Sequence, residues 1–169
     1  LLDMSLPNEL HPLQLAASSG GGYEIEQSLR FNDAYLSRTP SSAGNRRTFT
    51  FSVWLKRSGI SAISGFFSAF SSIEGRDAFR FDSANSLRIF LDETTDANIY
   101  SNALYRDVSA WYHFVAAIDT TQATAADRVK IWINGESVSF SSASYPAQNT
   151  DLHVNNTVGQ YVGTAYSQT

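Results

Sequence analysis

Residues 48–56 read TFTFSVWLK and show the strict alternation of side chains that typifies a half-buried β-strand. One face would carry the apolar residues Phe49, Phe51, Val53 and Leu55. The opposite face would carry Thr50, Ser52, Trp54 and Lys56. Because successive side chains of a strand point to opposite sides, this stretch sends every second side chain into one core.

The same alternation recurs at residues 78–82, 86–91, 129–133 and 136–140. The last two runs flank Asn134-Gly135, a dipeptide that predicts a β-hairpin because both turn positions need a positive φ. Residues 111–118 (WYHFVAAI) are apolar on both faces, which predicts a central strand. The apolar stretch 60–70 is expected to carry a further short strand or a core loop.

A chain of 169 residues with this pattern is predicted to form one all-β domain. Its hydrophobic content of 43% supplies a core. Short strands follow one another with turn residues about every ten positions, and only residues 120–126 allow a helical turn. The pattern predicts a two-sheet sandwich or a barrel, and periodicity alone does not choose between them.

Composition excludes several classes of function. The net charge of -4 leaves no basic surface of the kind that binds nucleic acid. No apolar run reaches the ~20 residues that cross a bilayer as a helix, so we expect no membrane insertion. Cysteine is absent, which excludes disulfides, thiolate zinc sites and cysteine nucleophiles together.

The first 22 residues differ from the rest of the chain. They contain Pro7 and Pro12 and end in the Gly/Ser run at residues 18–22, which is typical of a flexible hinge. We expect an arm at residues 1–22 and a β-sandwich domain at residues 23–169. The arm would be disordered, pack on the domain, or tether it to a larger assembly.

Four segments occur in a distinctive order, at residues 28–36 (SLRFNDAYL), 49–56, 111–115 and 129–135. The order and the residue patterns of these segments resemble the sequence motifs of the laminin-G-like (concanavalin-A-like) domain family. The resemblance implies an antiparallel two-sheet jelly-roll sandwich, and it covers residues 28 to 140.

Loop segments resemble a narrower group, the structural proteins of marine bacteriophages, at residues 28–40, 105–113, 119–130 and 145–151. This resemblance implies a virion protein, carried on a tail fibre or on a capsid-surface appendage. The partners would be other virion proteins or further copies of the chain, and a cell-surface glycan is the expected ligand.

One departure from the family pattern concerns the C-terminal end. Members of the family usually close with a strand resembling F-x-G-x-(L/I)-x-E-(V/I), and no such strand follows residues 154–163. A sheet that lacks a strand exposes unpaired N–H and C=O groups. We therefore expect either that the chain is a fragment, or that a neighbouring segment supplies the strand, with residues 4–19 as one candidate.

Catalytic groups are not evident in the sequence. A glycosidase needs two carboxyl groups about 5–9 Å apart. Glu24 and Glu26 have a suitable spacing, but they directly follow the glycine run at the edge of the domain. No Gly-x-Ser-x-Gly motif accompanies His11, His113 or His153. We expect a non-enzymatic protein, and a secreted carbohydrate-binding module or glycoside hydrolase of the same fold is the alternative.

Calcium is the cofactor that the resemblance implies, at the rim of the sandwich. A hard cation prefers carboxylate and carbonyl oxygens from loops. The densest acidic loop spans residues 92–96, so Asp92 and Asp96 are the predicted ligands. Asp119 and Asp127 bracket a second acidic loop.

Aromatic residues make up 13% of the chain, and exposed aromatic rings can stack on sugars. Three tyrosines are predicted to lie in loops and to contact a ligand, namely Tyr100, Tyr105 and Tyr145. The tryptophans are predicted to lie on strands, where most such residues belong to the core: Trp54, Trp111 and Trp132.

Overall fold

The computed structural model describes residues 27–72, 75–91 and 97–164. The chain divides into two compact units, Leu1–Arg30 and Phe31–Thr169, and all the described strands belong to the second. The arm expected at residues 1–22 lies outside the described residues. Within the described ranges no helix is long and apolar enough to span a membrane.

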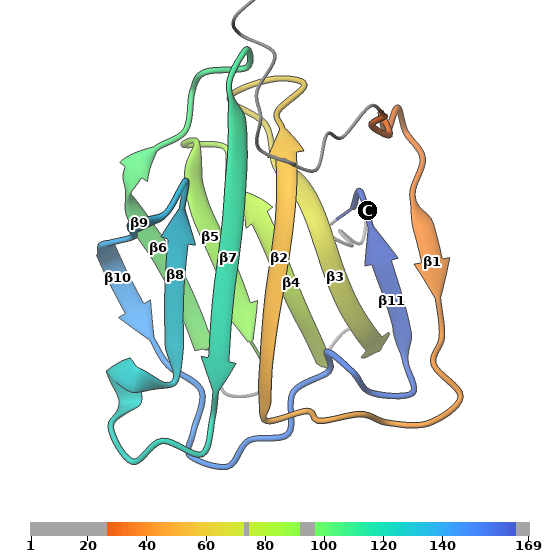
Figure 1. The fold of residues 1–169 in the computed structure, drawn as a ribbon, viewed down its shortest axis with the longest axis vertical. Helices are drawn as coiled ribbons and strands as arrows, with labels where there is room; N and C mark the ends of the chain where they lie inside the picture. Colours follow the sequence, from red (N-terminus) through yellow and green to blue (C-terminus); the bar gives the residue numbers. More distant parts are fainter. Residues whose placement is uncertain (1–26, 73–74, 92–96, 165–169) are drawn as a thin grey trace, which may run out of the picture. The chain divides into compact units, whose positions relative to one another are not determined.

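The second unit is a sandwich of two antiparallel sheets (Figure 1). Its larger sheet has the order β1-β11-β3-β4-β5-β6-β10, and its smaller sheet has the order β2-β7-β8-β9. This confirms the predicted all-β jelly-roll architecture and decides against a closed barrel. The strands are β1 Leu36–Arg38, β2 Thr48–Lys56, β3 Ser64–Ser72, β4 Gly75–Phe81, β5 Ser86–Leu91, β6 Ala97–Leu104, β7 Trp111–Asp119, β8 Val129–Ile133, β9 Glu136–Ser137, β10 Phe140–Ser144 and β11 Gly159–Val162, with a 3-10 helix, η3, at Ala125–Asp127.

Several predicted strands occur where alternation placed them. Strand β2 covers residues 48–56, and β7 lies between β2 and β8, as expected of a central strand. The hairpin turn has the predicted backbone, with φ of 53° at Asn134 and 84° at Gly135.

The run at residues 136–140 was predicted as one strand, which is wrong. It is divided between the sheets: β9 ends at Ser137 in the smaller sheet, and β10 begins at Phe140 in the larger one. The chain passes from one sheet to the other at residues 138–139, where Val138 still packs against the core. Val138 and Phe140 both pack against the core between the sheets, so the alternation of side chains continues across this change of sheet.

The core lies between the two sheets and is rich in phenylalanine. The ring of Phe114 on β7 lies 5.1 Å from Phe66, 5.6 Å from Phe79 and 6.0 Å from Phe51, measured between centroids. These contacts join β2 and β7 of one sheet to β3 and β4 of the other. Tertiary stability therefore depends on aromatic packing across the sandwich.

Candidate ligand-binding face

The outer face of the smaller sheet carries three tryptophans. Trp54 and Trp111 expose 53% and 48% of their surface, and Trp132 is half-buried. The register pairs Trp54 with His113 and Trp132 with Val115, so these side chains share one face of β2, β7 and β8. The prediction that the strand tryptophans belong to the core is thus wrong, since the inward positions of the same strands hold other residues.

The Trp54 ring is held in a fixed orientation. It stacks on the His113 ring with a centroid distance of 4.7 Å and an interplanar angle of 10°. His113 is in turn fixed by two hydrogen bonds: its Nε2 lies 3.0 Å from Ser52 Oγ, and its backbone N–H donates to Asn134 Oδ1 at 2.7 Å. A ring oriented in this way offers a flat apolar surface with little conformational entropy left to lose on binding.

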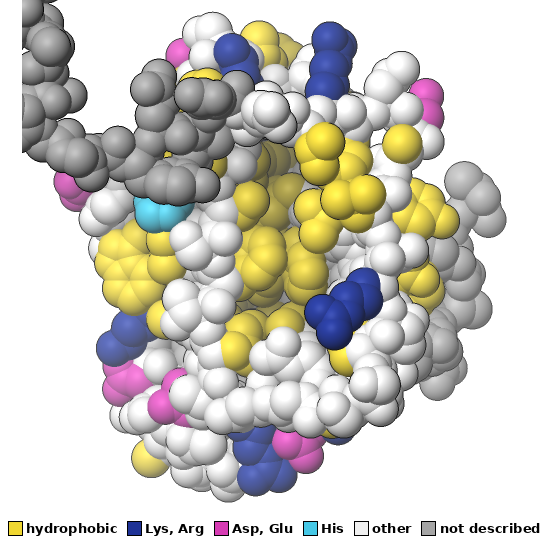
Figure 2. All heavy atoms as spheres, turned by 45° about the vertical axis from the view of Figure 1, so that its right-hand side comes forward, with side chains coloured by type: hydrophobic (Ala, Val, Ile, Leu, Met, Phe, Trp, Pro, Cys, Tyr) yellow, Lys and Arg dark blue, Asp and Glu magenta, His cyan; other side chains and the backbone are white. Residues whose placement is uncertain are grey.

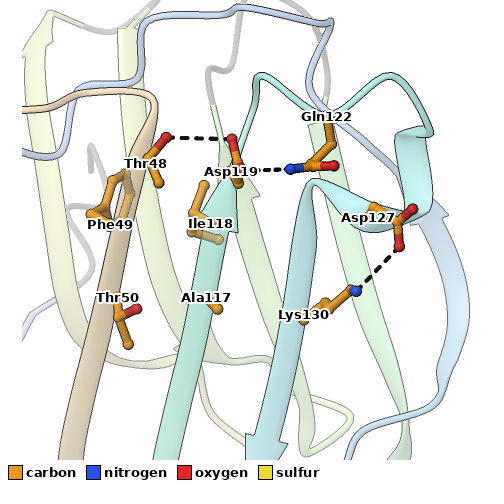
Figure 3. Close-up of a pocket in the computed structure, with 9 residues that line it drawn as sticks. All are labelled: Thr48, Phe49, Thr50, Ala117, Ile118, Asp119, Gln122, Asp127 and Lys130. Atoms are coloured by element: carbon orange, nitrogen blue, oxygen red, sulfur yellow. Dashed lines mark hydrogen bonds and ion pairs between the residues drawn. The ribbon is translucent and has the colours of Figure 1, made fainter.

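A hollow lies on the same face of the smaller sheet, beside the row that contains Trp132 (Figure 3). Thr50, Ala117 and Lys130 form a row across β2, β7 and β8, next to the row that contains Trp132. Adjacent rows on one face are about 6.7 Å apart, because they are separated by two residues along each strand. The short side chains of Thr50 and Ala117 leave a hollow of about 460 Å³.

The rim of the hollow is charged and internally bonded. Asp119 accepts hydrogen bonds from the Thr121 hydroxyl at 2.6 Å, the Gln122 amide at 2.6 Å and the Thr48 hydroxyl at 3.3 Å. These bonds, with that of Thr121 the strongest, lower the pKa of Asp119. Asp127 forms an ion pair with Lys130 at 3.2 Å. Asp119 therefore stays ionised and can accept hydrogen bonds from a ligand's hydroxyl groups.

The three tyrosines that were predicted to lie in loops and to contact a ligand have different surroundings. Tyr100 is on β6, where the Arg88 guanidinium lies 4.7 Å from its ring centroid. Tyr105 is buried between Phe81 and Tyr112, with both centroids 5.6 Å away, and burial raises the pKa of its hydroxyl. Tyr145 is half-buried against the core. Tyr105 and Tyr145 lie outside the strands, as predicted, whereas the prediction of a loop is wrong for Tyr100. Packing against residues of distant strands decides how far each ring is buried, and the local sequence does not specify it.

The predicted calcium ligands Asp92 and Asp96 lie outside the described residues, as do Glu24 and Glu26. Over the ranges that the structure describes, no three His, Asp or Glu side chains gather in a way that could hold a metal ion. The calcium site therefore stays a prediction.

Sequence reasoning missed the tryptophans although one signal for them was present. Alternation in residues 48–56 places Trp54 with Thr50, Ser52 and Lys56, on the face opposite to the phenylalanines. One exposed apolar residue is ordinary, but several that gather on the outer face of a sheet indicate either a second covering layer or a binding surface. In the structure no strand layer among the described residues covers this face.

Comparison with protein families gives one match. Residues 31–168 match the family model Laminin_G_3, described as the concanavalin A-like lectin/glucanases superfamily. The match spans most of the chain and all the described strands. No curated protein and no solved structure matches the chain.

Proposed function

The chain belongs to the concanavalin A-like lectin/glucanase superfamily, and from this premise we propose that it is a non-enzymatic adhesion domain that binds glycan through its tryptophan face. The tryptophan face is defined by Trp54, Trp111 and Trp132 together with the adjoining hollow. The observation that carries the proposal is the exposure of Trp54 and Trp111, each close to half, on the outer face of a sheet. Superfamily membership fits a carbohydrate-binding or adhesion role.

The chemistry of this face suits a sugar. A pyranose ring presents an apolar face of C–H groups and a rim of hydroxyl groups. The indole rings offer a flat apolar surface, and the rim of the hollow offers a carboxylate at Asp119 and an ammonium at Lys130. Ligand sites commonly combine aromatic surface with a few well-placed polar groups in this manner.

The properties of the two carboxylates in the hollow favour a glycan-binding role and not the hydrolysis of a glycan. A glycosidase general acid needs a raised pKa, so that it is protonated when it meets the substrate. Asp119 has a lowered pKa, and Asp127 is paired with Lys130. Turnover of a β-glucan that is abolished by Asp119→Asn would overturn the non-enzymatic proposal in favour of a glycoside hydrolase.

We also propose that the domain belongs to a phage particle, as a part of a tail fibre or capsid-surface appendage. The support is the resemblance of the loops at residues 28–40, 105–113, 119–130 and 145–151 to phage structural proteins. Its partners would then be other virion proteins or further copies of itself. A purely architectural subunit would instead show no glycan binding and a stable symmetric oligomer in light scattering.

Replacing Trp54 and Trp111 by alanine is expected to weaken glycan binding strongly. Truncating a tryptophan at the centre of a binding surface typically costs 2 kcal/mol or more, so each change should weaken binding about 30-fold. A glycan array with the unaltered chain would identify the ligand, and titration calorimetry would compare the variants on that glycan.

The exposed Tyr35 provides the control, because it is an aromatic residue outside the smaller sheet. Tyr35→Ala should bind as the unaltered chain does. Unchanged binding by the Trp54→Ala, Trp111→Ala double variant would exclude the tryptophan face as the site.

A further inference from the structure

The tryptophan face extends along the strands of the smaller sheet. Strand β7 lies between β2 and β8, so its outward side chains mark successive rows across the face. Trp111 begins the first row, and Trp54 pairs with His113 in the second. Trp132 pairs with Val115 in the third row. Trp111 and Trp132 are therefore about 13 Å apart along β7, a distance that one pyranose ring does not bridge.

The strand between the tryptophans carries short side chains. Val115 and Ala117 point outward from β7, and both are half-buried. Trp54 stands beside this strand on β2, and Trp132 stands beside it on β8. Ala117 lines the hollow, in the row next to that of Trp132. These residues and Trp111 form one track over β7, which we call the β7 track. From the row of Trp111 to the row of Ala117 it is about 20 Å long.

Polar side chains border the β7 track on both sides. Thr50 and Ser52 are exposed on β2, and Lys130 is exposed on β8. The Trp54 ring presents one face to a ligand, because the His113 ring stacks on its other face. Flat rings that are interleaved with hydroxyl and ammonium groups suit a ligand with apolar ring faces and polar edges.

Apolar exposure by itself does not define the β7 track. Strands β11 and β1 continue the larger sheet past β2, whose Phe51 ring lies 4.7 Å from Phe67 of β3. Leu36 of β1 and Val162 of β11 expose 54% and 39% of their surface. Figure 2 shows hydrophobic side chains gathered on this side of the molecule. Leu36 and Val162 are aliphatic and offer no flat ring to a sugar, so we assign no glycan to that side.

We propose that the β7 track binds an internal segment of a linear polysaccharide, which extends along β7 over about four sugar units. This inference rests on the proposed glycan-binding function and names the class of glycan. Pyranose units joined through equatorial bonds, as in β-1,4-linked chains, form a straight ribbon with C–H groups on the ring faces and hydroxyl groups at the edges. Such a ribbon lays its ring faces against the indoles and directs its hydroxyl groups to Thr50, Ser52 and Lys130. A terminal sugar is too short to use aromatic contacts that are spread over several rows.

Oligosaccharides of graded length test the proposal with the full chain. The probes are the linear β-1,4-linked oligomers of glucose, of mannose and of N-acetylglucosamine, each from the disaccharide to the hexasaccharide. In titration calorimetry the association constant of at least one series should rise at least about tenfold from disaccharide to tetrasaccharide and then level off, because only the longer chains reach a further indole. Reduction of the terminal sugar to an open-chain alditol should leave binding of the hexasaccharide unchanged. Equal affinity at all lengths, or no binding by any series, would overturn the proposal.

Two variants change the β7 track at different rows. Ala117→Phe places a bulky ring across the track from an outward position of a strand, where phenylalanine is well accepted, so the fold should persist. Its binding of the hexasaccharide should fall at least about tenfold. Trp132→Ala should flatten the rise in affinity between disaccharide and hexasaccharide. Leu36→Ala, on the opposite sheet, is the control and should leave the whole length series unchanged. Full length dependence in both track variants would contradict a chain that runs along β7.

The outcomes separate this inference from the proposed function on which it rests. Glycan binding that depends on Trp54 and Trp111, but that is as strong for a disaccharide as for the hexasaccharide, would leave the tryptophan face as a glycan site and overturn the extended binding mode. Loss of hexasaccharide binding on reduction of its terminal sugar would likewise assign the face to chain ends. Binding of no glycan, on the array or in the length series, would overturn both the inference and the proposed function.

Discussion

Replacing Phe114 by alanine is expected to lower the free energy of unfolding by about 3–5 kcal/mol, the range typical of a large aromatic residue lost from a core. Phe114 is fully buried on β7, and its ring contacts rings from both sheets. The substitution removes the transfer free energy of the ring and leaves a cavity between rigid strands, which relax only partly. A domain of ordinary stability has about 5–15 kcal/mol in total, so the variant should lose a large share of its stability.

Urea denaturation followed by tryptophan fluorescence measures this loss. Trp111→Ala is the control, because Trp111 is an aromatic residue on the same strand whose side chain faces solvent. Substitution at such a position should change stability by no more than about 0.5 kcal/mol. Equal losses in the two variants would mean that β7 does not bury one face against the larger sheet.

Replacing Asp77 by alanine is expected to lower the free energy of unfolding by about 3–5 kcal/mol. This is the range typical of removing one partner from a buried interaction that involves a charged group. Asp77 lies on β4 with no exposed surface, and its Oδ2 accepts hydrogen bonds from the backbone N–H groups of His153 and Val154 at 2.6 and 2.7 Å. Alanine would leave both amide groups buried without this acceptor. The segment that they hold buries Leu152 and Val154 and leads into β11, which lies between β1 and β3 in the larger sheet.

Two further variants test whether Asp77 acts as a hydrogen-bond acceptor and whether its buried position matters. Asp77→Asn keeps an oxygen able to occupy the position of Oδ2, so it should lose less stability than Asp77→Ala. Asp127→Ala removes an exposed carboxylate whose ion pair with Lys130 should contribute only about 0–1 kcal/mol. An equal loss in Asp77→Asn and Asp77→Ala would contradict the role of Asp77 as a hydrogen-bond acceptor for residues 153 and 154.

The parts of the fold that were predictable are those encoded by near neighbours in the chain. Alternation in residues 48–56 was enough to place β2 and to assign each of its side chains to a face. The Asn134-Gly135 dipeptide was enough to place the hairpin, because only a few residue types accept a positive φ at both turn positions. The same alternation already put Trp54 on the outer face, and it was the general tendency of tryptophan to be buried that misled the interpretation.

Tyr105 shows where such reasoning fails. It follows β6 directly and reads as a loop residue, yet Phe81 and Tyr112 enclose it from two other strands. The division of residues 136–140 between two sheets is a failure of the same kind. In both cases the result depends on which distant segment of the chain packs against these residues. The pattern of neighbouring residues does not specify that segment.

By itself, the sequence determined the class of fold, the positions of several strands such as β2, β7 and β8, and the face to which the residues of β2 point, because side-chain direction follows from the pleat of a single strand. Only the tertiary structure decided that the tryptophans form one surface beside a hollow, and that the larger sheet projects past β2. Both follow from strand order and register. These are set by hydrogen bonds and packing between residues tens of positions apart, such as Trp54 opposite His113 and Val162 opposite Phe67.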